Sequence, residues 1–108
     1  MWFPMELYQG QPDTTETVMY TVPANRQLVI KEFVICNTSA VDLTITIHIR
    51  RAAAVAAVDR RIMSALVIPA NATVYFPCSI VLNTTGIISG LASVANLTVT
   101  VSGEERII

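Results

Sequence analysis

Alternation of apolar and polar residues with a period of two is the feature that most limits what this chain can fold into. In residues 43–49, LTITIHI, four aliphatic side chains share one face, while Thr44, Thr46 and His48 share the other. Residues 97–101, LTVTV, repeat the pattern. Successive side chains of a β-strand point to opposite faces, and β-branched residues fit a pleated sheet better than a helix. Both segments are therefore predicted to be half-buried strands.

The tripeptide Pro-Ala-Asn occurs twice, at residues 23–25 and 69–71, and each copy lies between two apolar runs. Proline cannot donate to a strand ladder, and it biases the residue before it toward extended geometry. Asparagine favours turns, because its side chain can hydrogen-bond the local backbone. Each copy is therefore predicted to be a corner between two strands.

Further turns are predicted at residues 37–42, 83–86 and 93–96, where turn-forming residues gather. Residues 27–36 and 72–76 are apolar on both faces in part, as expected for strands near the middle of a sandwich or for a strand with a bulge. Seven or eight short strands result. The sequence therefore predicts an all-β chain that forms a single antiparallel β-sandwich of the jelly-roll or immunoglobulin-like kind.

The apolar content is high for a chain of this length. Hydrophobic residues make up 53% of the 108 residues and charged residues 14%, whereas a domain of this size buries roughly 65% of the surface of its unfolded chain. Part of the apolar excess is therefore expected to be covered by other chains, as in a homo-oligomer. The net charge of −1 lacks the field that nucleic-acid binding uses. No apolar run reaches the roughly 18 residues of a membrane span, so we expect neither nucleic acid nor membrane as a partner.

Two segments depart from the strand pattern. The first residues are large and apolar where a chain end is usually polar, so we expect an N-terminal arm over residues 1–8 and the sandwich over residues 9–108. Such an arm docks either on its own sandwich or on a neighbouring subunit. Residues 50–61 are rich in alanine between arginine pairs, and an excursion from the sandwich is predicted there. This excursion is either a solvated surface segment or a contact element whose arginines bind carboxylates of a neighbouring chain. The predicted subunit contacts are Trp2, Phe3, Met5, Arg50, Arg51, Arg60, Arg61, Ile107 and Ile108.

Signatures of enzyme chemistry are largely absent from the sequence. The single histidine, His48, falls on the polar face of its strand, where we expect it to be exposed and without a catalytic relay. Cys36 and Cys78 lie far apart and no metal-binding spacing occurs, so we expect reduced thiols and no metal site. No glycine-rich phosphate loop is present. We therefore predict no catalytic residues, no cofactor and no enzyme activity.

Several turn and strand-edge motifs stand out: LYQGQP at residues 7–12, VMYTVPAN at 18–25, VICNTS at 34–39 and IPAN at 68–71, with SGEE near the C-terminus. In these motifs the chain resembles a group of small β-sandwich proteins encoded among the structural genes of tailed bacteriophages. This resemblance implies a structural virion protein, such as a capsid decoration or cement protein or a part of the collar or tail. The implied partners are other virion proteins, including major capsid, collar or tail subunits. The implied location is the virion, after assembly in the cytoplasm of a bacterial host.

Two alternatives remain open. A carbohydrate-binding β-sandwich on a particle or cell surface would use the same strands and loops, but it would need exposed aromatic side chains grouped for stacking on sugars, and aromatic residues make up only 6% of the chain. A secreted, disulfide-linked glycoprotein ranks last. It rests on the two cysteines and on Asn-x-Ser/Thr triplets, which asparagine turns before threonine-rich strands also produce.

Overall fold

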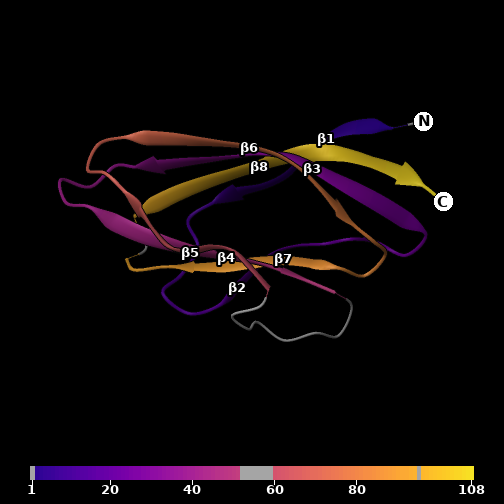
Figure 1. Ribbon diagram of the computed structural model, residues 1–108, viewed down its shortest axis with the longest axis horizontal. Helices are drawn as coiled ribbons and strands as arrows, with labels where there is room; N and C mark the ends of the chain where they lie inside the picture. The colour runs from indigo at the N-terminus through magenta and orange to yellow at the C-terminus, as the bar shows by residue number, and fades with distance from the viewer. Residues whose placement is uncertain (1, 52–59, 95) are drawn as a thin grey trace.

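Eight β-strands form two antiparallel sheets in the part of the chain that the structure, a computed structural model, describes: residues 2–51, 60–94 and 96–108. The strands are β1 (Phe3–Gly10), β2 (Thr17–Thr21), β3 (Arg26–Asn37), β4 (Leu43–Arg50), β5 (Arg61–Ile68), β6 (Thr73–Leu82), β7 (Ile87–Ala92) and β8 (Leu97–Ile107). Sheet A has the order β1-β8-β3-β6, and sheet B has the order β2-β7-β4-β5. Figure 1 shows them as an upper and a lower layer. The predicted all-β sandwich is confirmed.

The order of the strands identifies the sandwich as a jelly roll. β1 pairs with β8, β2 with β7, β3 with β6 and β4 with β5, as if one long antiparallel hairpin had been rolled up. The pairs β3–β8 and β4–β7 complete the two sheets. Eight strands in two such sheets are characteristic of a jelly roll, whereas an immunoglobulin sandwich divides its strands differently. No helix of the described residues is long and apolar enough to cross a membrane.

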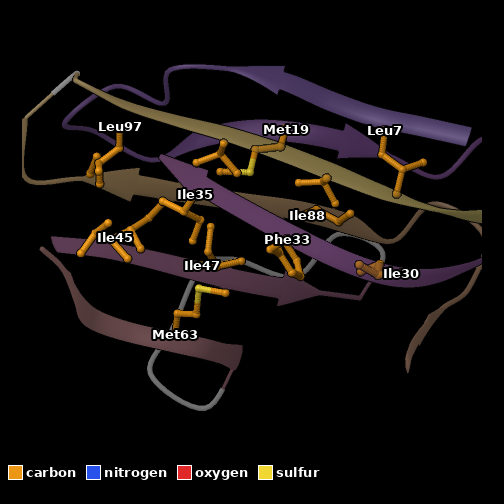
Figure 2. Close-up of a cluster of buried hydrophobic side chains, with 14 of the residues drawn as sticks. Leu7, Met19, Ile30, Phe33, Ile35, Ile45, Ile47, Met63, Ile88 and Leu97 are labelled. Carbon is orange, nitrogen blue, oxygen red and sulfur yellow. The ribbon is translucent and has the colours of Figure 1, made fainter. Parts of the chain in front are cut away.

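The alternating segments form the strands that were predicted from them. Residues 43–49 lie in β4 and residues 97–101 in β8, and their apolar faces point between the sheets. Figure 2 shows the resulting core, with Phe33 and Ile35 from sheet A directed toward Ile45 and Ile47 from sheet B. Fully buried aliphatic and aromatic side chains supply most of the stabilisation of such a sandwich.

Both Pro-Ala-Asn copies are corners, as predicted. The first connects β2 to β3 and the second connects β5 to β6. Asn25 and Asn71 have backbone φ angles of 61° and 56°. These values lie in the left-handed region, which asparagine tolerates better than most residues other than glycine. The left-handed backbone therefore explains why asparagine occupies the last position of each corner.

The two segments that are apolar on both faces occupy different places in sheet A. Residues 27–36 belong to β3, which lies between β8 and β6, and a register shift between Ile30 and Glu32 marks a bulge. Residues 73–76 form the first part of β6, which is an edge strand, so the central position that we considered for residues 72–76 is wrong. Pro77 in β6 agrees with an edge, because proline lacks the N–H that a central strand needs.

The expected boundary between an arm and the sandwich at residue 8 does not hold. Phe3–Gly10 is strand β1, which forms the edge of sheet A and pairs with β8. The physical reason is that Leu7 is buried and Met5 is half-buried against the core, so this segment has an inward face. Of the predicted excursion at residues 50–61, residues 52–59 lie outside the described part of the chain.

Candidate subunit interface

The two chain ends lie together at one end of the jelly roll. β1 and β8 are antiparallel neighbours, with Phe3 opposite Glu105, so the start of β1 adjoins the end of β8. Figure 1 shows both termini at the same end of sheet A. The structure therefore brings together predicted contact residues that stand about a hundred positions apart in the sequence.

Four large apolar side chains are exposed at this end and are named here the terminal patch: Trp2, Phe3, Ile107 and Ile108. Their exposed fractions run from 37% for Trp2 to 63% for Ile108. Met5, the fifth predicted apolar contact, packs against the core and is not part of the patch. The four residues share this end of the molecule, and exposed apolar residues concentrated at one end are typical of surfaces that bind another protein.

Arg106 holds the indole of Trp2 in place. Its guanidinium carbon lies 5.1 Å from the centre of a Trp2 ring, within the range of a cation–π contact. The Nε atom of Arg106 also donates a hydrogen bond of 2.9 Å to the side-chain oxygen of Gln27. Arg106, oriented by its hydrogen bond to Gln27, therefore restricts the Trp2 side chain from one face. This lowers the side-chain entropy that Trp2 would lose on binding a partner.

Beneath the terminal patch, the carboxylate of Glu105 is almost completely buried, with 1% of its surface exposed. The Tyr20 hydroxyl donates a hydrogen bond of 2.5 Å to Oε2, and Nη1 of Arg26 donates one of 3.0 Å to Oε1. A buried carboxylate needs such partners, because burying it unpaired is very unfavourable. These contacts tie the end of β8 to β2 and β3, and so they stabilise the strand that carries part of the patch.

Tyr20 remains a hydrogen-bond donor throughout the neutral pH range. The pKa of the Tyr20 hydroxyl is raised from its usual 10.0 to about 12, mainly by burial and also by the hydrogen bond to Glu105 and the negative charge of that carboxylate. The positive charge of Arg26 acts in the opposite direction. Ionising the phenol would bring a second negative charge beside a buried carboxylate.

The arginine-bracketed segment leaves and re-enters sheet B at the same end. Arg50, the last residue of β4, lies opposite Ile87 of β7. The backbone N–H of Val22 donates to the carbonyl of the neighbouring Gly86 at 2.9 Å, which joins this region to the first Pro-Ala-Asn corner. That corner also accepts the backbone N–H of Ile108. Sheet A thus carries exposed apolar side chains at this end of the molecule, and arginines lie at the ends of β4 and β5 in sheet B.

The four predicted arginines differ in exposure. Arg51 and Arg61 are exposed, whereas Arg50 and Arg60 are half-buried. Arg51 lines a hollow of about 250 Å³ with residues of the turn between β6 and β7. Exposed guanidinium groups offer planar, bidentate donors to carboxylates.

His48 is buried, with 2% of its surface exposed, so our expectation of an exposed histidine is wrong. Nδ1 lies 3.0 Å from the Glu16 carboxylate, and Nε of Arg61 donates to Nε2 at 3.3 Å. Arg61 also donates to the Ser64 hydroxyl at 3.1 Å. The alternation placed His48 on the correct face of β4, but long-range contacts from Glu16 and Arg61 cover that face.

The contacts around His48 suit a structural role. Nε2 accepts from an arginine, so Nδ1 carries the proton that is donated to Glu16. A hydrolytic relay would instead place a hydroxyl or thiol at Nε2. Among the described residues, no three histidine, cysteine or acidic side chains gather where they could hold a metal ion.

The sequence reasoning missed Tyr20, Arg26 and Glu105. A signal for Glu105 was present, because the period of two that begins at Leu97 continues inward through Gly103 to Glu105. No local signal identifies its two partners, which lie 85 and 79 residues away in the chain.

Of the comparisons with known proteins, only the one with solved structures finds similar chains. No protein-family model matches this chain, and no curated protein sequence matches it. A structure of infectious bursal disease virus, Gx strain, contains a chain that is similar with a TM-score of 0.59 and 15% identity, over 99% of this chain and 33% of that chain. The crystal structure of the T13 particle of the same virus gives a TM-score of 0.57 and 12% identity, over 97% of this chain and 30% of that chain.

The shared property is the fold. This chain spans about one third of the length of the viral chains that it matches. At 12 and 15% identity the likeness concerns the path of the backbone and not particular side chains.

Proposed function

We propose that this protein is a structural subunit of a virion that binds neighbouring subunits through the terminal patch. The observation that carries the proposal is the exposure of Trp2, Phe3, Ile107 and Ile108 at one end of a jelly roll whose core residues are almost fully buried. The fold is shared with chains from the particles of a virus. Fold alone does not define function, so the proposal rests on the patch.

The finer part of the proposal is a tailed bacteriophage and a decoration, cement, collar or tail position. It is supported by the motif resemblance described above, which covers most of the chain but involves turn and edge residues. Its partners are other virion proteins and further copies of this chain, and its location is the virion assembled in the bacterial cytoplasm. Such a role requires binding and no catalysis.

The size of the patch indicates that attachment uses many copies. Fully burying one large apolar side chain contributes about 1.5–3 kcal/mol, so four partly exposed side chains contribute about 4 kcal/mol together. Association of two proteins costs at least about 4 kcal/mol in lost freedom of motion. One patch therefore gives little net affinity, and repeated copies on a symmetric particle, or a second contact, must supply the rest.

The carbohydrate-binding alternative gains no support from the described residues. A platform for sugar rings needs aromatic faces side by side. Trp2 has the Arg106 guanidinium over its ring, and Tyr75, the most exposed tyrosine, lies on β6 opposite Val34, toward the other end of sheet A. Trp2 and Tyr75 therefore do not form one surface, and of the exposed aromatic side chains only Phe3 lies at the same end as Trp2.

The test replaces Trp2 and Phe3 with serine and measures incorporation into gradient-purified virions by quantitative mass spectrometry. The matched control replaces Val41 and Val94, which are exposed in turns at the opposite end of the sandwich, with serine. We expect at least a tenfold loss of incorporation for Trp2→Ser/Phe3→Ser, with an unchanged circular dichroism spectrum, and little change for the control. Equal incorporation of the two variants would show that the patch is not the contact.

A further inference from the structure

Three polar side chains, Glu16, His48 and Arg61, meet on the outer face of sheet B and are named here the His48 cluster. His48 is the single histidine of the chain, and its ring is almost fully buried. The ring lies between two groups of opposite charge, because Nδ1 is 3.0 Å from the Glu16 carboxylate and Nε of Arg61 donates to Nε2 at 3.3 Å. Attachment through the terminal patch makes no use of this buried, titratable group.

The elements around His48 bring few other charges among the described residues. On β7, Ser89 lies directly opposite His48, and neither β7 nor its neighbour β2 has a charged residue. On β4 itself, Arg50 follows two positions after His48, is half-buried and takes part in an interaction of its own. The charges that face the ring are therefore those of Glu16 and Arg61, with Arg50 beside them.

The contact between Arg61 and His48 requires a neutral ring. Arginine has only donors, so Nε2 must present its lone pair, and the ring proton lies on Nδ1, which donates to Glu16. A histidine that takes up a second proton becomes a donor at both nitrogens. Two N–H groups of two positively charged side chains would then point at each other across the 3.3 Å between Nε2 and Nε of Arg61. The contact with Glu16 would persist, since Nδ1 remains a donor.

We propose that His48 is a pH-sensitive switch that holds the start of β5 while its ring is neutral and releases it when the ring is charged. Histidine is the side chain that usually changes its charge between pH 8 and pH 5. Arg61 is the first residue of β5 and lies opposite His48 in the pairing of β4 with β5. Charging the ring separates Arg61 from it and loosens this end of the hairpin.

Ser89 offers a buried hydrogen-bond partner to the charged ring. Its Oγ atom is fully buried and has no hydrogen-bond partner in the part of the chain that the structure describes. Residues directly opposite each other in an antiparallel pair have Cβ atoms about 4.5–5.5 Å apart on the same face. The Ser89 hydroxyl therefore lies within reach of a ring that has turned away from Arg61.

The loosening is confined to the start of β5. Further along the strand, the backbone N–H of Ala65 donates to the Thr46 hydroxyl at 3.1 Å, and this contact does not involve the ring. Met63 and Ile68 of β5 are buried in the core. These contacts hold the rest of β5 on β4 at either charge of His48.

NMR of the isolated full chain at pH 8 and pH 5 tests both steps. Because His48 is the single histidine, a chain labelled with nitrogen-15 histidine gives one pair of ring signals. We expect a proton on Nδ1 alone at pH 8 and protons on both nitrogens at pH 5. Backbone hydrogen exchange, expressed as protection factors to remove the intrinsic effect of pH, then reports on β5. We expect the protection of residues 61–63 to fall at least tenfold from pH 8 to pH 5, while that of β3 and β8 stays unchanged.

His48→Gln is the matched control for this measurement. A glutamine amide can donate to Glu16 and accept from Arg61, but it has no charged form. We expect residues 61–63 of this variant to keep the same protection at both pH values. Arg61→Met lacks the contact at every pH, so it should already show at pH 8 the low protection that the wild type shows at pH 5. Thermal unfolding checks that both variants are folded.

Three results would overturn this inference. The first is a ring that keeps a single proton at pH 5 or already has two at pH 8, and the second is a doubly protonated ring with unchanged protection of residues 61–63. The third is a His48→Gln variant whose protection falls as much as that of the wild type. The first two are measured on the wild type, so they decide the question even where a variant does not fold. None of them bears on the proposed function, which particle incorporation tests separately.

Discussion

Replacing Tyr20 with phenylalanine removes one hydroxyl oxygen and leaves the ring in place, so it isolates the contact between Tyr20 and Glu105. That hydroxyl donates to a carboxylate of which only 1% is exposed, and water cannot easily replace it. A hydrogen bond to a charged group contributes about 1.5–3 kcal/mol. Arg26 still donates to the other carboxylate oxygen in the variant. We therefore expect Tyr20→Phe to lower the free energy of unfolding by about 2 kcal/mol.

Urea unfolding at neutral pH, followed by circular dichroism, measures this difference. For a domain near 100 residues a loss of about 2 kcal/mol corresponds to a fall of about 10 °C in the unfolding temperature. The control is Tyr75→Phe, because the Tyr75 side chain is exposed and its hydroxyl is hydrated, so its change should stay within about 0.5 kcal/mol. If Tyr20→Phe also stayed within about 0.5 kcal/mol of the wild type, the buried carboxylate would not depend on this donor, and our reasoning about this end of the molecule would be refuted.

Three further predictions concern stability. The pKa of Tyr20 rises from 10.0 to about 12 on folding, so the extra stability of the wild type over Tyr20→Phe should be complete below pH 10 and should shrink as the pH rises to about 12. A difference in the free energy of unfolding that stayed constant over this pH range would contradict this. Gly103→Ala should lower the free energy of unfolding by about 1–3 kcal/mol, because the added Cβ would clash with the Val29 carbonyl oxygen. Gly10→Ala is the control in the same urea assay, because its added Cβ meets only the movable Tyr8 side chain. Equal losses for the two variants would count against a clash at Gly103. Asn25→Ala should lose about 1 kcal/mol in thermal unfolding while Asn25→Gly stays close to the wild type, and an alanine variant of full stability would exclude a requirement for positive φ.

The parts of the fold that could be predicted from the sequence are those with local causes. The alternation in β4 and β8 depends only on neighbouring residues, and so does the turn chemistry of Asn25 and Asn71. The choice between a jelly roll and an immunoglobulin-like sandwich depends on which strands pair. That choice is made by contacts between β1 and β8 and between β2 and β7, which no short stretch of sequence encodes.

The candidate interface likewise has features with local causes, which the sequence predicts, and features that depend on long-range contacts. Trp2 and Ile108 were predicted as contacts because each is apolar near a chain end, but their meeting in one patch follows from the pairing of β1 with β8. His48 was placed on the correct face, but its burial depends on Glu16 and Arg61, which come from other parts of the chain. The sequence pattern thus predicted which way these side chains point and not what covers them.

The start of the chain shows a further limit. Its large apolar residues indicated that it docks on an apolar surface, and the choice between its own sandwich and a neighbouring subunit stayed open. In the structure Phe3–Gly10 docks on its own sheet as β1, and the first side chains of this segment remain exposed at the end of the molecule. Both uses of the segment are therefore compatible with its composition.

The most direct test of the proposed function is the amount of this chain in purified virions after a wash at high salt. Salt weakens contacts between exposed charges but not contacts between apolar side chains. We predict that the chain stays with the particles in a fixed ratio to the major capsid or tail subunit, as quantitative mass spectrometry would show. A chain that is absent from the particles, or that occurs only in traces without a fixed ratio, would contradict a structural role in the virion.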